Sequence, residues 1–212
     1  MVVMPTMAED SVHCVITDIP YAEVNRESGG LRTFDKAAAD IITFDISHFV
    51  NELVRICSGS FYVFCGQQQL SLIDSYFRAN ELTTRTIVWE KTNPAPINGD
   101  KLWLSGIELC VFARKANATF NGSCRNTVLR YPAGHSKLHP TQKNEDLFTD
   151  LILTSSNEGD TIFDPCMGSG TSGIAAVKHR RKFIGVERNA EYFELSKRRI
   201  EEAHSFSESL LF

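Results

Sequence analysis

The sequence predicts an α/β fold built on a doubly wound, mostly parallel sheet. Short apolar runs typical of buried strands alternate with segments whose apolar residues repeat at helical spacing. Two of the runs end in turns rich in polar residues or glycine, where open α/β sheets bind their ligands. At 212 residues and 42% apolar, the chain can bury one core, so we expect a single domain over residues 1–212.

The first half of the chain predicts three strands and two helices. The strands are expected at 12–16, 61–65 and 85–89, and the helices at 46–57 and 70–77. The first helix carries its apolar residues on one face, and Ser58-Gly59 is expected to close it. Between the first strand and this helix, residues 22–43 form a long polar segment typical of a lid or binding loop.

The second half continues the alternation. Strands are expected at 107–112, 160–163 and 182–186, and helices at 144–154, 171–179 and 190–203. No internal repeat and no low-complexity tract interrupts them.

Composition argues against several classes of protein. No apolar run approaches the roughly 18 residues of a membrane span, and no signal-peptide pattern opens the chain. The six cysteines are scattered without a C-x-x-C pair, which favours buried free thiols in a reducing cytoplasm over a zinc site. We therefore expect a cytoplasmic protein without a metal.

The net charge of −4 argues mildly against a protein that coats nucleic acid, but its distribution is uneven. From Arg114 to Lys143 there is no acidic residue, while six lysines and arginines and two histidines occur there. This segment either binds a polyanion such as DNA or is a solvated loop that lacks carboxylates, and composition leaves both open.

A glycine-rich turn follows the strand expected at 160–163. Gly168-Ser169-Gly170-Thr171-Ser172-Gly173 lets the backbone pass close to a ligand and leads into a helix whose first N–H groups favour an anion. Glu187, at the end of the next strand, has the spacing of an acid that accepts hydrogen bonds from ribose hydroxyls. The pattern alone fits NAD and S-adenosylmethionine equally, and a surface acid stays open for Glu187.

The other turn, Asp18-Ile19-Pro20-Tyr21, places a carboxylate, a stiffened backbone and an aromatic ring at a strand end. Taken alone it can be an ordinary turn. Together with Asp164 to Thr171 and His139 to Lys143, it resembles the D-P-P-Y, D-P-F-x-G-S-G-T and H-P-T-Q-K-P motifs of the amino-group DNA methyltransferases. Ile19 and Cys166 depart from those motifs, as does Asn144.

The motif order resembles the β class of that family, which is circularly permuted, because the catalytic motif precedes the cofactor motif. Residues 89–96 and 105–108 also resemble family blocks, so the likeness spans nearly the whole chain. The resemblance implies a Rossmann-like S-adenosylmethionine-dependent fold and an enzyme that methylates a base flipped out of double-stranded DNA.

The resemblance also implies roles for individual residues. An exocyclic amine is a poor nucleophile, so acceptors against its N–H bonds would stabilise developing positive charge. The catalytic residues expected are Asp18, Ile19, Pro20 and Tyr21. Aspartate at the first position resembles the adenine-N6 enzymes more than the cytosine-N4 enzymes, which stay open as an alternative. The cofactor-binding residues expected are Asp164, Pro165, Cys166, Gly168, Gly170, Thr171 and Glu187, with Thr141 and Lys143 near the methionine end.

The family's target-recognition region would fall within 114–138. The side chains there suited to phosphates or base edges are Arg125, Asn126, Arg130 and His135. So short a segment fits a solitary methyltransferase of a bacterium or phage, related to restriction-modification enzymes.

Further alternatives stay open. The permuted family usually opens with a strand ending in Gly-Asp, which this sequence does not show, so a catalytically degenerate DNA-binding protein remains an alternative. A dinucleotide oxidoreductase gives no role to Asp18 through Tyr21. The C-terminal residues 207–212 are faintly similar to peptides that dock on sliding clamps, or form a disordered end. A homodimer is also open.

Overall fold

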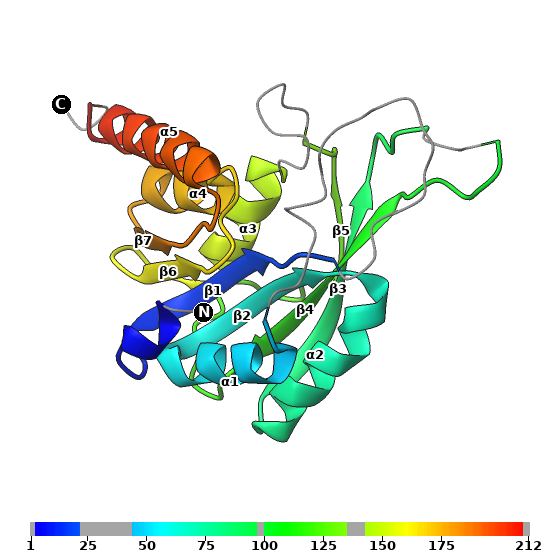
Figure 1. The fold of residues 1–212 in the computed structure, drawn as a ribbon, viewed down its shortest axis with the longest axis horizontal. Helices are drawn as coiled ribbons and strands as arrows, with labels where there is room; N and C mark the ends of the chain where they lie inside the picture. Colours follow the sequence, from blue (N-terminus) through cyan, green and yellow to red (C-terminus); the bar gives the residue numbers. More distant parts are fainter. Residues whose placement is uncertain (1–2, 22–43, 97–99, 135–142, 210–212) are drawn as a thin grey trace.

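The computed structural model describes residues 3–21, 44–96, 100–134 and 143–209. Within these ranges, one seven-stranded sheet is covered by helices on both faces (Figure 1). The strands are β1 (Val12–Asp18), β2 (Cys57–Cys65), β3 (Thr83–Lys91), β4 (Ile107–Arg114), β5 (Val128–Tyr131), β6 (Thr161–Asp164) and β7 (Lys182–Gly185). The helices are η1 (Met4–Thr6), α1 (Ile46–Ile56), α2 (Gln67–Ala79), α3 (Glu145–Ser155), α4 (Thr171–Lys178) and α5 (Ala190–Ser209).

The strand order is β5-β3-β4-β2-β1-β6-β7. Every neighbouring pair is parallel except those made by β4, which runs antiparallel to both β2 and β3. From β1 the chain continues to β2 on one side, and from β6 it continues to β7 on the other. The strand order therefore reverses between β1 and β6, and open α/β sheets bind ligands at the carboxyl ends of the strands at such a point.

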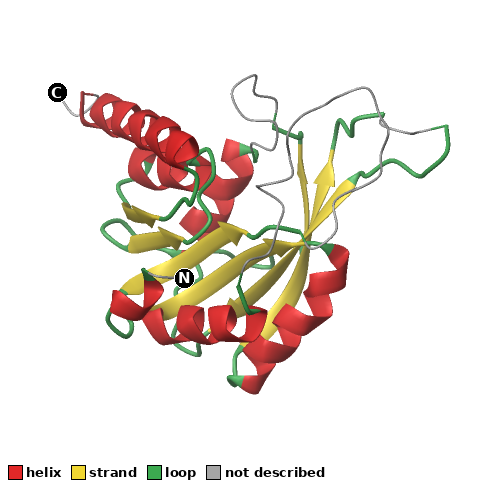
Figure 2. Cartoon of the chain, in the orientation of Figure 1, coloured by secondary structure: helices red, strands yellow, loops and turns green. Residues whose placement is uncertain are grey.

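Alternating side chains of the strands form two apolar layers. Val15 and Phe61 face the layer with α1 and α2, whereas Ile16 and Tyr62 face the layer with α3 and α4. Figure 2 shows the helices divided between the two faces of the sheet. Because both faces are covered, the central strands are buried almost throughout, as parallel sheets require.

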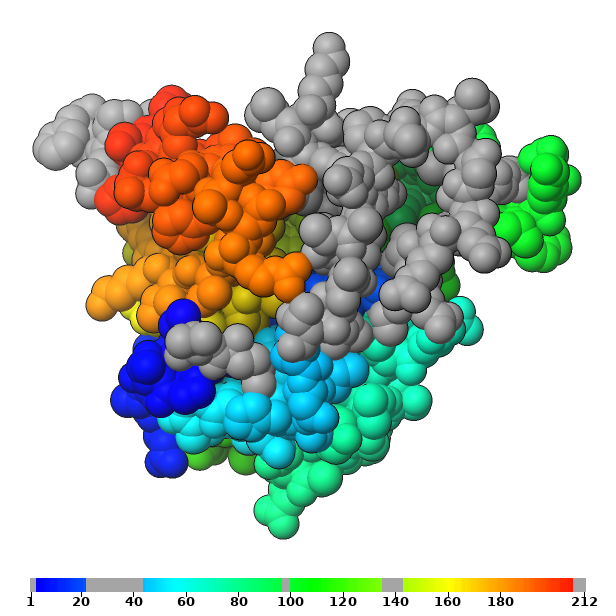
Figure 3. All heavy atoms as spheres, viewed as in Figure 1, coloured from blue at the N-terminus to red at the C-terminus, as the bar shows by residue number. Residues whose placement is uncertain are grey.

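The segment before β1 packs beside α1. Arg55 of α1 donates hydrogen bonds to the carbonyls of Met4 and Met7, each at 2.8 Å. The space-filling view shows this segment (blue) seated against α1 (cyan) (Figure 3).

The expected strands and helices all appear, although several boundaries differ and one of them is wrong in kind. The sequence predicts that Ser58-Gly59 closes the first helix, but both residues lie inside β2. Gly59 is required there because β1 passes so close that a Cβ would stand 2.0 Å from the carbonyl oxygen of His13. The register of the β1–β2 pair shifts at this point, between Val12 and Cys14.

Two further differences concern strand and helix content. No strand is expected within 114–138, but β5 lies within it and pairs with the edge of β3. The last helix continues to Ser209, six residues beyond its expected end.

In the described residues no helix is long and apolar enough to cross a membrane, and no group of three metal-binding side chains gathers. All six cysteines are free thiols.

Candidate active site

The Asp18-Ile19-Pro20-Tyr21 turn is fixed by the strands and helix around it. The Ile19 amide donates to the carbonyl of Phe64 at 3.1 Å, which extends the pairing of β1 with β2, and the Ile19 side chain is buried in the core. Gln69 of α2 donates to the carbonyl of Pro20 at 2.9 Å and accepts from the amide of Gly66. The turn therefore holds the Asp18 carboxylate at the point where the strand order reverses.

A cluster of alternating charges surrounds that carboxylate. The Lys143 ammonium lies 3.0 Å from Asp18 Oδ2 and also binds Glu108 Oε2. The Lys91 ammonium lies 2.9 Å from the other Glu108 oxygen, Oε1. These four residues come from β1, β3, β4 and the segment before α3, and their side chains are 11% to 27% exposed.

Aromatic rings line the same cluster. The Lys143 ammonium lies 5.5 Å from the ring centroid of Tyr21, 5.8 Å from that of Phe64 and 5.9 Å from that of Trp89. The Tyr21 hydroxyl accepts from Lys143 at 3.2 Å and donates to Glu108 Oε2 at 3.4 Å. The rings exclude water on several sides, so the charges interact more strongly than they would in solvent.

The surroundings shift the pKa values of the three central groups. Burial raises the pKa of Asp18, although the Lys143 ammonium opposes this effect. Burial alone would raise the pKa of Glu108, but Lys143 and Lys91 together bring that pKa below its usual value. Burial alone would lower the pKa of Lys143, yet the two carboxylates raise it. Lys143 and Glu108 therefore stay charged at neutral pH.

One acceptor in the cluster is left over. Asp18 Oδ2 binds Lys143, whereas Asp18 Oδ1 is buried and has no hydrogen-bond partner among the described residues. A buried carboxylate oxygen without a donor costs free energy, and this one is available to accept a hydrogen bond from a ligand.

The glycine-rich turn lies beside Asp18, because β6 is the parallel neighbour of β1. Gly168 and Gly170 adopt φ values of +50° and +81°, a region that favours glycine. A Cβ at Gly170 would stand 2.9 Å from Cβ of Ser196, whereas nothing lies within 4 Å of a Cβ at Gly168. The turn is thus packed against α5 on one side and open at Gly168.

Two carboxylates hold this turn. Glu187 Oε2 accepts from the amide of Gly168 at 3.0 Å, and its Oε1 accepts from the amide of Asn189 at 2.8 Å. Asp164 is buried and accepts from the amide of Cys166 at 3.0 Å and from the hydroxyl of Ser172 at 2.6 Å. Burial raises the pKa of Asp164 to about 7.

The structure separates the residues expected to contact DNA. Arg125 binds Asp150 and donates to Thr154 Oγ1 at 2.9 Å, along the half of α3 that ends away from Asp18. Arg130 lies on β5 beside the carboxyl end of β3, where it donates to Glu90 at 3.0 Å with its side chain 73% exposed. The Asn126 side chain accepts from the amide of Val128. His135, Thr141 and residues 210–212 lie outside the described residues.

Several contacts of the site were not predicted. Lys143 was expected near the methionine end of a cofactor, and the structure places its ammonium on Asp18. Glu108, Lys91 and Gln69 received no role, because their partners in the site lie distant in the chain, 35 residues apart for Glu108 and Lys143 and 49 for Gln69 and Pro20. The one available signal was that Lys91 and Glu108 lie in blocks 89–96 and 105–108, which resemble family motifs.

Known proteins resemble this chain in sequence and fold. The model of the DNA methylase family (N6_N4_Mtase) matches residues 12–198. The Type II methyltransferase M2.DpnII of Streptococcus pneumoniae is 34% identical over 54% of this chain and 50% of its own length. The DNA adenine methyltransferase YhdJ of Escherichia coli K12 is 28% identical over 93% of this chain and 79% of its own. The chain spans about half the length of the Type II methyltransferases that it matches.

The fold has solved counterparts as well. The crystal structure of the M1.HpyAVI–SAM complex superposes with a TM-score of 0.70, at 28% identity, over 92% of this chain and 90% of that one. The family match covers the strand that ends at Asp18, the charged cluster and the glycine-rich turn together. The chain therefore belongs to the N6/N4 DNA methylase family.

Proposed function

We propose that this protein is a DNA methyltransferase that transfers a methyl group from S-adenosylmethionine to the exocyclic N6 of an adenine flipped out of the duplex. The observation that carries the proposal is the buried, unpartnered oxygen of Asp18 beside a glycine-rich turn at the reversal of strand order. Family membership supports the reaction type, and YhdJ, a relative along most of the chain, is named an adenine methyltransferase.

The glycine-rich turn fits the proposed cofactor. Gly168 is open where a side chain would stand, and no side chain caps the start of α4, so the backbone there can approach a ligand's carboxylate. Each Glu187 oxygen accepts one backbone amide and keeps lone-pair capacity for ribose hydroxyls. When bound, S-adenosylmethionine supplies an electrophilic methyl group. Asp164 acts indirectly, because its hydrogen bonds to Cys166 and Ser172 fix the turn.

The catalytic motif supplies acceptors and a stacking surface. Asp18 Oδ1 accepts an N–H bond of the target amine, which increases the electron density on nitrogen and stabilises positive charge as it develops. The backbone carbonyl of Ile19 is the second acceptor, and Pro20 stiffens the turn that presents it. Tyr21 stacks on the flipped base. A carboxyl with a raised pKa is also suited to take the proton that the amine releases.

The DNA-facing surface would include the carboxyl ends of the strands and part of 114–138. Arg130 is the member of the expected set that is both exposed and close to this edge, so we assign it a phosphate contact. Arg125 is held by Asp150 and Thr154, and we assign it to the fold of this segment. A second copy of the chain and a sliding clamp, through residues 207–212, stay predictions as partners.

Mass spectrometry of nucleosides tests the proposed function. DNA from a methylation-deficient host expressing the chain is compared with DNA from a host expressing Asp18→Ala. We expect N6-methyladenine in the first and its loss in the second. N4-methylcytosine would reassign the base, whereas an unmodified genome despite folded protein would contradict the proposal and favour a degenerate DNA-binding protein.

A further inference from the structure

Glu108 lies at the centre of the charged cluster but outside both functional motifs. Its two carboxylate oxygens are divided between two cations, Lys143 on Oε2 and Lys91 on Oε1. The side chain is 16% exposed, so it is held among other protein groups more than by water. Nothing in the reaction proposed above assigns this carboxylate a task.

Glu108 affects the position of the Lys143 ammonium relative to Asp18. An ammonium has three N–H donors. Here the three acceptors that contact it are Asp18, Glu108 and the Tyr21 hydroxyl. Two of the acceptors, Glu108 and Tyr21, draw the ammonium away from Asp18 Oδ1. As a result, Lys143 binds only one Asp18 oxygen, and the other stays without a partner.

We propose that Glu108 is a positioning residue: with Lys91, it holds the Lys143 ammonium on Asp18 Oδ2 and so keeps Asp18 Oδ1 open for the substrate amine. The inference rests on the proposed function. Without Glu108, the ammonium would have Asp18 as its single carboxylate partner. It would then move toward both Asp18 oxygens and compete with the amine for Oδ1.

The remaining groups that face Asp18 do not provide this restraint, and the Tyr21 hydroxyl, which also interacts with the Asp18 carboxyl, is held neutral because burial raises its pKa. Cys65 on β2 and Cys110 on β4 are buried, and burial raises the pKa of each thiol, so both stay neutral. Asp164 and Cys166, at the end of β6, also face Asp18 but are bound to the glycine-rich turn. Among the described residues facing Asp18, Lys143 is the cation that contacts it.

The test compares Glu108→Gln with Glu52→Gln, a matched control. Glu52 is an ion-paired carboxylate on α1 with 15% side-chain exposure, and it lies outside the site. Single-turnover methyl transfer is measured with saturating cofactor over a range of duplex DNA concentrations, and thermal unfolding is measured alongside. We expect Glu108→Gln to slow transfer about tenfold while KM for DNA changes little, and Glu52→Gln to leave the rate unchanged.

A double variant tests whether Glu108 acts through Lys143. Lys143→Met alone should slow transfer, and Lys143→Met combined with Glu108→Gln should be no slower than Lys143→Met. Glu108→Asp, which keeps the charge, should recover part of the lost rate. If the fold-losses in transfer rate of the two single variants multiplied in the double variant, Glu108 would act independently of Lys143. That result would overturn the inference. Faster transfer by Lys143→Met would also overturn the inference, because the ammonium would then block the substrate amine in the wild-type protein.

A second readout needs no turnover. Carbon-13 NMR of the free protein, with Asp18→Asn used for assignment, follows the titration of the Asp18 carboxyl. We expect the pKa of Asp18 to fall in Glu108→Gln, because the Glu108 charge no longer raises it and Lys143 then binds Asp18 alone, and to rise in Lys143→Met. A slower enzyme with a lower Asp18 pKa is a combination that general loosening of the fold does not produce. An unchanged pKa in Glu108→Gln would overturn the inference even if the wild type proved to methylate no DNA.

Discussion

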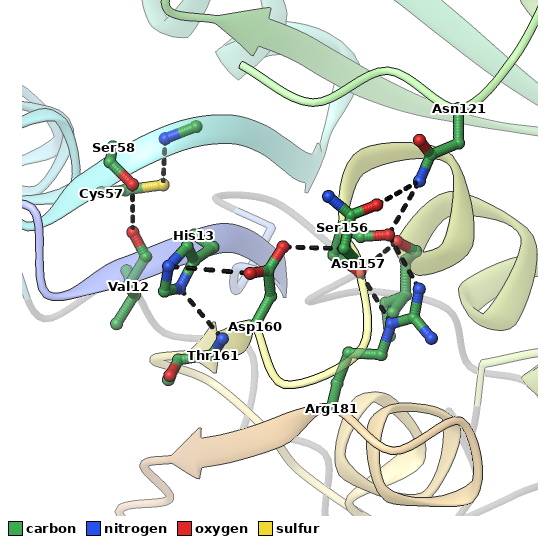
Figure 4. A network of polar contacts seen from close by, with 12 residues as sticks. Val12, His13, Cys57, Ser58, Asn121, Ser156, Asn157, Asp160, Thr161 and Arg181 are labelled. Carbon is green, nitrogen blue, oxygen red and sulfur yellow. Dashed lines mark hydrogen bonds and ion pairs between the residues drawn. The ribbon is translucent and has the colours of Figure 1, made fainter. Parts of the chain in front are cut away.

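The carboxyl ends and the amino ends of the strands both carry polar side chains, but they use them differently. At the edge formed by the carboxyl ends of the parallel strands, Asp18 and Lys143 meet Glu108, which lies at the amino end of antiparallel β4. Their charges form a poorly hydrated cluster in which one carboxylate oxygen lacks a partner. At the amino ends, side chains bind the backbone of neighbouring loops (Figure 4). The difference separates a region built to bind a ligand from one that holds the sheet together.

The amino-end network is a set of matched hydrogen bonds. Arg181 donates to the hydroxyl of Ser156 at 3.1 Å, to its carbonyl at 2.8 Å and to the carbonyl of His179 at 2.6 Å. His13 Nδ1 accepts from the amide of Thr161 at 3.0 Å, which ties β1 to β6. Asn121 donates to the carbonyls of Leu153 and Ser156. Most of these bonds satisfy main-chain groups at the ends of helices, strands and loops, so this edge contributes stability.

The largest expected effect concerns the pH dependence of stability. Burial raises the pKa of Asp164 to about 7, from 3.8 in the unfolded chain. Between these values the folded state keeps a proton that the unfolded state has lost, so the free energy of unfolding falls as pH rises from about 4 to about 7. The loss can reach about 4 kcal/mol, and Asp164→Asn, which cannot ionise, should remove it.

Urea unfolding at pH 4, 6 and 8 measures this loss. Asp160→Asn, at the amino ends of the strands, serves as the control and should keep the wild-type decline. If Asp164→Asn declined as steeply as the wild type between pH 4 and pH 8, the buried carboxyl would not be its source.

An intermediate effect is expected at the amino ends. Arg181→Met removes three hydrogen bonds and leaves buried Ser156 short of donors, so it should lower the free energy of unfolding by about 2 kcal/mol. Its neighbour Arg180 pairs with Glu158 in solvent, and Arg180→Met should cost under about 0.5 kcal/mol. Denaturant titration gives both values. A slower methyl-transfer rate per folded molecule of Arg181→Met would break the proposed division between the two edges.

The smallest effect separates the two arginines of the 114–138 segment. Arg130→Gln should weaken DNA binding and reduce the slope of log affinity against log salt by about 0.9, as loss of one phosphate contact requires. Arg125→Gln should keep the slope and instead destabilise the fold by about 1 kcal/mol, because Asp150 and Thr154 lose their partner. Fluorescence anisotropy with a labelled duplex, over a range of salt, measures the slope. The reverse assignment of the two effects would place Arg125 on the DNA.

Sequence reasoning reached the sheet and the two motif turns because those features are local. The apolar runs and the turn residues that follow them located β1 and β6. Both motifs lie at strand ends, where the fold brings them together. It missed β5, a four-residue strand whose alternation is too short to separate from loop sequence. It also misplaced Ser58-Gly59, since the close approach of β1 that requires Gly59 is a tertiary contact.

The charged cluster was beyond sequence reasoning for the same physical reason. Lys143 and Asp18 are 125 residues apart, and no spacing rule relates them. Glu108 and Lys91 face each other because β3 and β4 are antiparallel neighbours, which the alternation of strands and helices did not predict. Motif residues could be recognised individually, but their mutual contacts had to come from the fold.

The most direct test of the division between the two edges measures catalysis and stability on the same preparations of Asp18→Asn and Arg181→Met. We expect Asp18→Asn to slow single-turnover methyl transfer at least about a hundredfold while its free energy of unfolding stays within about 1 kcal/mol of wild type. Arg181→Met should show the opposite pattern, unfolding more easily and transferring methyl groups at the wild-type rate. Near-normal transfer by folded Asp18→Asn would contradict the account, because the unpartnered oxygen would then not be where the amine binds.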